Sequence, residues 1–267
     1  MPDICIKVLS WNLHGLAWPL SIDPGGRMDR VSAKIRELSP DVVLLQEVWL
    51  GSHVDRLTRA LQPDWIPVCI WQRRRGPRGG LLTFVNASEG WRARAAPQFH
   101  AFTASAPIWK VWEGDGIGGK GVLAVELERG DQRISAVNTH LQSQYPGIDY
   151  VRVREAQLLE LRETVSRLDA SVPAIVAGDF NTDSHESLYS TISPLGKDLT
   201  AASRVVGNRG TTAHPERPEW IDYIVAANSD AWIVSAGLEL IENQRADVPY
   251  SDHSGLFCTL KLARRPA

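Results

Sequence analysis

Repeated strand-like runs of apolar residues run through this chain of 267 residues, and most of them end in an acidic, amide or imidazole side chain. In AIVAGDFN, residues 174–181, a run typical of a fully buried strand ends at Asp179 and Asn181. An unpaired buried charge is costly, so many such ends are tolerable only where they compensate one another. The pattern therefore predicts that several strand ends converge on one polar site. The other polar positions are Asn12, Glu47, Asn138, His140, Asp222, Asp252 and His253.

The order of apolar runs predicts an α/β fold. Strands are expected at residues 4–11, 42–46, 80–86, 121–128, 134–139, 173–177, 220–226 and 256–260, and helices at 28–38, 54–62 and 151–168. Many short strands with few helices between them predict packed sheets flanked by helices. No low-complexity linker, repeat or break in composition divides the chain, so we expect one domain over residues 1–267.

Charge, cysteine usage and hydropathy narrow the class of protein. The net charge of −2 argues against a broad nucleic-acid surface, although RRRGPR at residues 73–78 is a local basic patch. Three cysteines without metal-type spacing are typical of a reducing compartment. A strand pattern starts within four residues of Met1, and no apolar run approaches ~20 residues. We expect a monomeric, cytoplasmic protein without a signal peptide or transmembrane segment.

The types of polar residue indicate phosphoryl chemistry at a hard cation. Carboxylate and amide oxygens favour Mg²⁺, with Mn²⁺ as a substitute, over Zn²⁺. Of two histidines beside such an ion, one can donate to a phosphate and the other can move the proton of an attacking water. Asp179 is expected to hold that water and Asn181 to bind the phosphate. A carboxylate distant in sequence, with Asp222 the best candidate, is expected to orient the imidazole.

Each piece alone has an ordinary structural explanation. Asp and Asn in GDFN favour turns for local reasons, and a single buried histidine such as His140 is more often a hydrogen-bonded core residue than a catalyst. The order of the pieces and their common position at strand ends favour the functional interpretation.

Six short motifs carry a family resemblance. They are WN (11–12), LQE (45–47), NTHLQ (138–142), GDFN (178–181), IDYI (221–224) and SDH (251–253). This set resembles the endonuclease/exonuclease/phosphatase superfamily of metal-dependent phosphoesterases. The resemblance implies a four-layer αββα sandwich of two packed mixed sheets flanked by helices.

The resemblance also implies roles for individual residues. Catalytic roles fall on His140, Asp179, Asn181, Asp222 and His253, and metal-site roles fall on Asn12, Glu47 and Asp252. We expect further contacts to the substrate from Lys120 and Asn138. The implied reaction is hydrolysis of a phosphodiester by direct in-line attack of water.

Longer segments are similar to the neutral sphingomyelinase branch of that superfamily. These are WNLHGLAWPL, RMDRV, LQEVW, GGKGV and THLQSQYPGIDYVRVREAQLLEL. The similarity favours a phospholipid or another small phosphodiester as substrate. Trp109 and Trp112, in the glycine-rich stretch PIWKVWEGDGIGG, are then expected to contact a lipid surface.

Three other functions stay open at this point. A magnesium-dependent nuclease acting on DNA or RNA would contact backbone phosphates through Arg73, Arg74, Arg75 and Arg78. A phosphomonoesterase is a weaker alternative. A non-catalytic binding protein of the same fold is disfavoured because every expected polar position holds a chemically competent residue.

Overall fold

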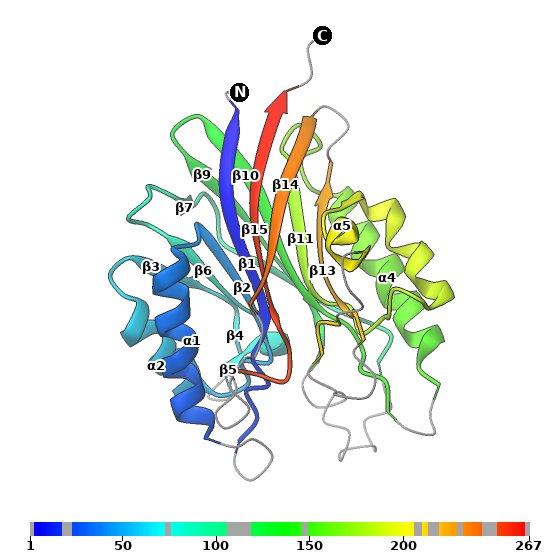
Figure 1. Cartoon of the computed structure of the whole chain (residues 1–267), viewed down its shortest axis with the longest axis horizontal. Coiled ribbons are helices and arrows are strands. Elements are labelled where there is room, and N and C mark those ends of the chain that lie inside the picture. Colours follow the sequence, from blue (N-terminus) through cyan, green and yellow to red (C-terminus); the bar gives the residue numbers. More distant parts are fainter. Residues whose placement is uncertain are drawn as a thin grey trace.

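The computed structural model describes residues 3–17, 23–72, 76–105, 119–145, 149–205, 210–212, 219–228, 232–241 and 250–264. Two β-sheets pack face to face, and helices cover the outer face of each sheet (Figure 1). The layers are therefore helix, sheet, sheet and helix, which confirms the expected α/β sandwich of two mixed sheets.

The first sheet has the strand order β14-β15-β1-β2-β6-β3. Its two central strands β1 and β2 are parallel, whereas β1 pairs with β15 in antiparallel orientation. The strands are β1 (Ile4–Asn12), β2 (Val42–Gln46), β3 (Trp65–Val68), β6 (Leu82–Asn86), β14 (Trp232–Ile241) and β15 (Gly255–Arg264).

The second sheet has the order β12-β13-β11-β10-β9-β7, and β8 also pairs with β9. Here β10 and β11 are parallel, and β13 runs antiparallel to β11. The strands are β7 (Arg92–Ala93), β8 (Gln98–Ala101), β9 (Gly121–Arg129), β10 (Gln132–His140), β11 (Ala174–Asp179), β12 (Lys197–Asp198) and β13 (Asp222–Ala227). A separate hairpin pairs β4 (Trp71–Gln72) with β5 (Gly76–Pro77).

Helices α1 (Pro24–Leu38) and α2 (Gly51–Leu61) lie against the first sheet, and α4 (Val151–Ser166) and α5 (Ala201–Val205) lie beside the second (Figure 1). Short 3₁₀ turns are η1 (Arg78–Gly80), η3 (Ser187–Thr191) and η4 (Ser193–Leu195). Helix α1 begins where Asp23 accepts a hydrogen bond from the Gly26 N–H at 3.0 Å. It ends at Ser39, which has a left-handed backbone and precedes Pro40.

The apolar core has two parts because alternate residues of a strand face opposite sides of a sheet. In β1, Ile6 and Val8 face the interior between the two sheets. Leu9 and Trp11 pack instead with the apolar side of α1, which includes Met28. The alternation in the sequence thus specifies both the sheet–sheet and the sheet–helix interface.

The short strands β3, β7, β8 and β12 were not predicted, and three further features differ from the expectations. Strand β14, residues 232–241, was not predicted, since it is a partly exposed edge strand that contains Gly237 and only a weak apolar run. Helix α1 starts four residues earlier than the apolar spacing indicates, because Asp23 and Pro24 form its capped first turn. Helix α2 starts at Gly51, also before the expected position.

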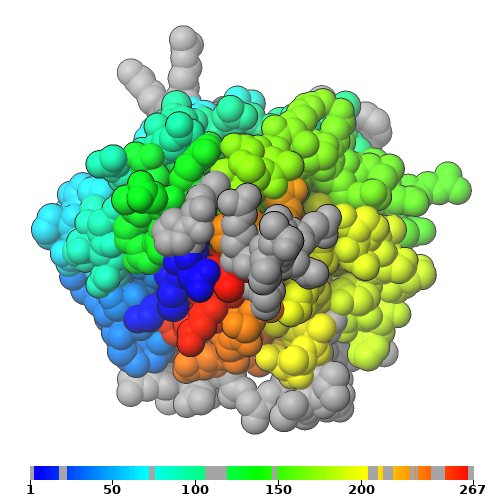
Figure 2. Space-filling view, turned by 90° about the horizontal axis from the view of Figure 1, so that it is seen from above, coloured from blue at the N-terminus to red at the C-terminus, as the bar shows by residue number. Residues whose placement is uncertain are grey.

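The first residues of β1 and the last residues of β15 lie at the same end of the sandwich. Viewed from that end, the first part of the chain (blue and cyan) occupies one side and the helical region around α4 and α5 (green to yellow) the other (Figure 2). Strand β1 runs away from this end, so Asn12 lies at the opposite end (Figure 1). In the described parts of the chain, no helix is long and apolar enough to cross a membrane.

Candidate active site

Strand pairing brings the predicted residues to one edge of both sheets. In the first sheet Asn12 pairs with Gln46 across the parallel strands β1 and β2, and Glu47 follows directly. In the second sheet, Asp179 of β11 pairs with His140 of β10. Parallel neighbouring strands end at the same edge, which is why polar residues after separate apolar runs become neighbours in space.

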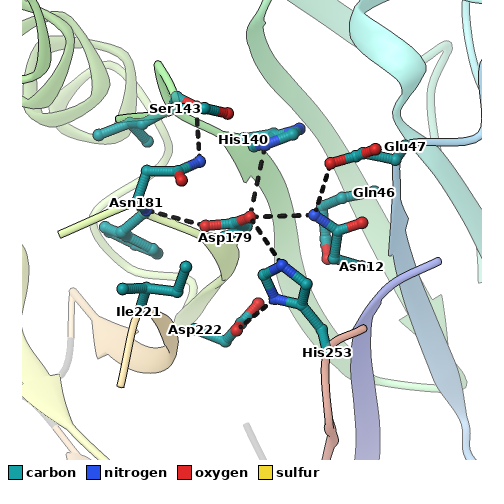
Figure 3. A network of polar contacts seen from close by, with 12 residues as sticks. Asn12, Gln46, Glu47, His140, Ser143, Asp179, Asn181, Ile221, Asp222 and His253 are labelled. Carbon is teal, nitrogen blue, oxygen red and sulfur yellow. Dashed lines mark hydrogen bonds and ion pairs between the residues drawn. The ribbon is translucent and has the colours of Figure 1, made fainter. Parts of the chain in front are cut away.

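Asp179 is the centre of the polar network (Figure 3). Its Oδ2 accepts a hydrogen bond from Asn12 Nδ2 at 3.0 Å and lies 3.4 Å from His140 Nε2 and 3.8 Å from His253 Nε2. Its Oδ1 accepts from the backbone N–H of Asn181 at 2.8 Å. The two sheets therefore meet at this one buried carboxylate.

The imidazole of His253 is oriented by Asp222, as the sequence favoured. His253 Nδ1 lies 2.8 Å from Asp222 Oδ2, and both side chains are buried. Although burial opposes protonation, the negative charge of Asp222 holds the pKa of His253 well above its usual value. Burial, together with the charge of Asp222, raises the pKa of Asp179 to about 7. These two groups therefore have the properties of a proton-transfer pair.

Lys120 and His140 form a second buried pair. Lys120 Nζ lies 2.8 Å from His140 Nε2 and donates to the Leu141 carbonyl at 2.7 Å and to Ser143 Oγ at 2.9 Å. Burial, followed by the positive charge of Lys120, lowers the pKa of His140 well below its usual value. His140 is therefore neutral, and its Nδ1 has no hydrogen-bond partner among the described residues.

Glu47 and Asp252 lie on the more open side of the network, with His14 between them. His14 Nδ1 is 2.9 Å from Asp252 Oδ2 and 4.0 Å from Glu47 Oε2. The Asp252 side chain is 51% exposed and that of Glu47 is 17% exposed. Partial burial raises the pKa of Asp252, but the hydrogen bond from His14 outweighs this effect and lowers the pKa to about 2. Both carboxylates are accessible from solvent.

Asn12 joins Glu47 and Asp179 through its side-chain amide. Its Nδ2 donates to Glu47 Oε1 at 3.0 Å as well as to Asp179, and its Oδ1 accepts from the His14 N–H at 3.0 Å. In this orientation the amide oxygen is turned away from Glu47. In this structure Asn12 therefore positions two carboxylates, and its place at a metal site stays a prediction.

Asn138 requires a correction. Its side chain is fully buried between the sheets, where its Oδ1 accepts from Gln46 Nε2 at 2.8 Å. Its Nδ2 donates to the Leu45 carbonyl at 3.0 Å and to the Leu82 carbonyl at 3.3 Å. The expected contact with substrate is wrong, because a buried amide that is hydrogen-bonded on both atoms does not reach a ligand.

The backbone around the site has unusual conformations. His14, Glu47 and Asn181 have φ values of 45°, 57° and 47°, in the left-handed region that non-glycine residues avoid. Gly178 has a φ of 150°, and a Cβ at this position would lie 1.9 Å from the Thr139 carbonyl oxygen. The absence of a side chain at Gly178 therefore allows the end of β11 to lie directly against β10.

Two contacts attach the segment before β15 to β1. The Trp11 indole Nε1 donates to the His253 carbonyl at 2.9 Å, and Ser251 Oγ donates to the Asn12 carbonyl at 2.6 Å. His253 is thus held in place by β1, which lies more than 200 residues away in sequence.

Some predicted contacts lie outside the described residues. Trp109 and Trp112, and Arg73, Arg74 and Arg75 of the basic patch, belong to this group. Arg78 is described, and its guanidinium lies over the Phe99 ring at 4.8 Å.

His14, Gln46 and Arg27 were not among the predicted site residues. His14 follows Asn12 by two residues, and Gln46 directly precedes Glu47, so proximity to the motifs was the available signal. Arg27 NH1 donates to the carbonyls of Leu13 and His14, at 3.1 and 2.9 Å, and no local pattern indicates this contact.

Known proteins share this sequence pattern and fold. Among curated relatives, the "Putative neutral sphingomyelinase" of Drosophila melanogaster is 23% identical over 73% of this chain and 43% of its own length. Sphingomyelin phosphodiesterase 2 of Homo sapiens is 24% identical over 99% of this chain and 67% of its length. The chain thus spans about two fifths of the first relative and two thirds of the second.

Solved structures with this fold include TDP2 of D. rerio complexed with a single-strand DNA product. It has a TM-score of 0.73 at 16% identity and covers 96% of this chain and 98% of its own. Sphingomyelinase C of Streptomyces griseocarneus has a TM-score of 0.67 at 18% identity, with 96% and 99% coverage. At these identities the structures confirm the fold alone.

A family model described as the Endonuclease/Exonuclease/phosphatase family matches residues 9–253. This range extends from the middle of β1 to the histidine that contacts both Asp179 and Asp222. The chain belongs to the endonuclease/exonuclease/phosphatase family, with relatives in its sphingomyelinase-like branch.

Proposed function

We propose that this protein is a metal-dependent phosphodiesterase that hydrolyses a phospholipid or another small phosphodiester of the sphingomyelinase type. The observation that carries the proposal is the double connection of Asp179. One side of this carboxylate faces the His253–Asp222 pair, and the other is joined through Asn12 to Glu47. A proton-transfer pair directly beside a solvent-accessible carboxylate fits hydrolysis at phosphorus.

The donor set beside Glu47 fits a divalent cation. Glu47 and Asp252 offer carboxylate oxygens that solvent reaches, and Mg²⁺ is held in many phosphoryl-transfer sites by one or two carboxylates plus waters. Bound there, Mg²⁺, or Mn²⁺ in its place, would neutralise negative charge on the phosphoryl oxygens. Possible ligand atoms of Asp179, Asp222 and His253 also lie within 4.8 Å of one another, but these three residues are buried, whereas solvent reaches Glu47 and Asp252.

The protein's own groups account for the proton transfer. Asp179 and His253 orient the attacking water, and Asp222 holds His253 in place during the transfer. A carboxylate pKa near 7 suits a group that accepts a proton at neutral pH. Asn181, together with His140 and Lys120, stabilises charge that develops on the phosphate. The reaction is a direct displacement without a covalent intermediate.

One assay tests the proposal. Sphingomyelin micelles, plasmid DNA and a chromogenic phosphodiester are incubated with the protein, with and without Mg²⁺. We expect Mg²⁺-dependent cleavage of sphingomyelin and the chromogenic ester, and little cleavage of DNA. Absence of hydrolysis of all three substrates with either Mg²⁺ or Mn²⁺ would contradict a phosphodiesterase.

A second experiment tests the lipid contact proposed from sequence for Trp109 and Trp112. Replacing both by alanine is expected to weaken hydrolysis of micelles while sparing the soluble chromogenic ester. Equal losses on both substrates would contradict a role in surface contact.

The nuclease alternative is favoured by one specific finding, the shared fold with a TDP2 structure that holds a DNA product. A nuclease that neutralises backbone phosphates with arginines loses affinity steeply as salt rises. Binding of a fluorescent single-stranded DNA between 50 and 200 mM salt, roughly the range over which such losses are large, separates the two functions. A flat response excludes phosphate-driven binding.

We further propose a monomeric, cytoplasmic enzyme formed by one domain over residues 1–267.

A further inference from the structure

His14 lies between the two carboxylates of the proposed cation site. Its Nδ1 is 2.9 Å from Asp252 Oδ2 and 4.0 Å from Glu47 Oε2. The same nitrogen therefore faces both oxygens. It donates a hydrogen bond to Asp252, so a cation that binds this nitrogen would displace its proton to solvent. The His14 side chain is 30% exposed, so an ion that reaches the carboxylates also reaches this imidazole.

The backbone holds His14 in this position from both sides. Its N–H donates to Asn12 Oδ1 at 3.0 Å, and its carbonyl accepts from the buried Arg27 at 2.9 Å. The next residue, Gly15, donates its N–H to the Glu47 carbonyl at 3.0 Å. A Cβ at Gly15 would lie 2.2 Å from that carbonyl oxygen, so the His14 segment sits directly against the backbone of Glu47.

The conformation of His14 itself is unfavourable outside this setting. Its φ of 45° lies in the left-handed region, which is unfavourable for a non-glycine residue. Strain of this kind persists where the surroundings over-determine the backbone, and it is concentrated at ligand-binding sites. The backbone contacts of His14 therefore hold its imidazole beside the two carboxylates.

An imidazole nitrogen changes the ion that such a site prefers. Mg²⁺ takes oxygen ligands and dehydrates reluctantly, whereas first-row transition-metal ions accept nitrogen readily. We propose that His14 is a third ligand of the cation held by Glu47 and Asp252, and that this site therefore selects Mn²⁺ over Mg²⁺. The inference rests on the cation site of the proposed function and specifies its ligand set and its metal.

Calorimetric titration of the purified, metal-free chain with Mn²⁺ and with Mg²⁺ tests the selectivity. The wild-type protein is expected to bind Mn²⁺ at least ~10-fold more tightly than Mg²⁺. In His14→Ala, Mn²⁺ affinity should fall ~10-fold or more while Mg²⁺ affinity changes by less than about threefold. The exposed His185, replaced in His185→Ala, serves as the matched control and should leave both affinities unchanged. An equal Mn²⁺ to Mg²⁺ affinity ratio in wild type and His14→Ala would overturn the proposal.

Electron spin-echo spectroscopy of the bound Mn²⁺ provides a readout that does not depend on activity. Modulation from a directly coordinated nitrogen is expected in the wild type and in His185→Ala, and it should disappear in His14→Ala. Modulation that persists in His14→Ala would show that another residue supplies the nitrogen. A role for His14 on the substrate instead would appear as a raised KM with unchanged metal affinity, and would also overturn the inference.

Glu47→Gln separates failure of this inference from failure of the proposed function. If Glu47→Gln abolishes binding of both ions while His14→Ala changes neither, the cation site stands and only the role of His14 fails. If Glu47→Gln leaves the binding of both ions unchanged, the cation site of the proposed function is itself misplaced.

Discussion

Two buried carboxylates, Asp179 and Asp222, lie at paired positions of adjacent strands, and their partners differ. Asp222 bonds the imidazole of His253, whereas Asp179 lies among Asn12, His140 and His253. Like charges this close favour protonation of one of them, which together with burial places the pKa of Asp179 at about 7. Neighbouring strands thus place two identical side chains in different surroundings.

Asp222→Asn is expected to reduce turnover of the chromogenic ester by ~10²–10⁴, because His253 loses the charge that orients and stabilises its protonated form. Steady-state kinetics measure the effect, and circular dichroism checks the fold. Asp198→Asn is a matched control, since Asp198 also accepts hydrogen bonds, from Tyr189 and Thr200, on the edge strand β12. A loss of less than tenfold in Asp222→Asn would contradict the assigned role.

Gly178→Ala is expected to lower the free energy of unfolding by about 2–4 kcal/mol, because the new Cβ would lie 1.9 Å from the Thr139 carbonyl oxygen. Gly130→Ala provides the comparison: Gly130 also has a positive φ, of 56°, but nothing lies within 4 Å of a Cβ there. Its cost should be about 1–2 kcal/mol. Equal costs in urea unfolding would mean that conformation, and not the close approach, determines the requirement for glycine at 178.

Among the elements, α4 holds several loops through one polar face. Arg154 donates to Gln144 and Glu186, both at 2.9 Å. Gln157 accepts from the Gln142 N–H at 2.7 Å and donates to the Ala104 carbonyl at 2.8 Å. These positions are three residues apart and so lie on one side of the helix. The helix thereby fixes the segments after His140 and after Asn181.

Glu160 lies three residues further along this face of α4. Its contacts lead us to expect that its contribution to the free energy of unfolding depends on pH. Its carboxylate accepts from the Thr103 and Ala104 N–H groups and contacts His100. Burial raises the pKa of Glu160, but these hydrogen bonds outweigh it and leave the pKa below the usual value. The stabilisation is therefore full above the unfolded-state pKa of about 4.3 and is lost as pH falls through the lower folded-state pKa.

Glu160→Gln should cost about 1–2 kcal/mol at pH 7, and the difference from wild type should shrink towards pH 3, roughly one unit below the unfolded-state pKa. Urea unfolding at both pH values measures it. The exposed Glu163, which pairs with Arg167 one turn along, provides the control Glu163→Gln, with an expected cost below about 0.5 kcal/mol. A difference that grows on acidification would show that the sign assigned to Glu160 is wrong.

In the whole molecule, the two sheets are joined by apolar packing and, beneath the site, by a polar link between Gln46 and Asn138. Gln46 precedes Glu47, and Asn138 lies two residues before His140. The link therefore couples the spacing of the sheets to the distance between the two halves of the site.

Asn138→Ala is expected to destabilise the protein by about 2–4 kcal/mol, because it removes the buried hydrogen bonds of this amide with Gln46 Nε2 and with the Leu45 and Leu82 carbonyls. The double variant Gln46→Leu/Asn138→Leu should cost less than the sum of its single variants, since it removes both partners together. Chemical unfolding of the wild type, Gln46→Leu, Asn138→Leu and the double variant forms the thermodynamic cycle. Strict additivity would contradict a coupled link between the sheets.

Much of this protein was determined by local sequence. The alternation in β1 and the buried run of β11 specified strands. The motifs placed Asp179, His253 and Asp222 together, because parallel strands end at the edge where their antiparallel neighbours begin. The sequence by itself therefore specified the layered fold and the residue types at its active edge.

Tertiary structure alone decided how those side chains face one another. Asn138 reads as a site residue in NTH, yet its amide lies between the sheets; His14 reads as a loop residue, yet it lies between Glu47 and Asp252. Both outcomes depend on contacts between segments 30 to more than 200 residues apart in sequence, and on the left-handed backbone of His14 and Glu47. Local patterns report which face of a strand is buried, whereas the direction of a polar group is set by partners that only the folded chain brings together.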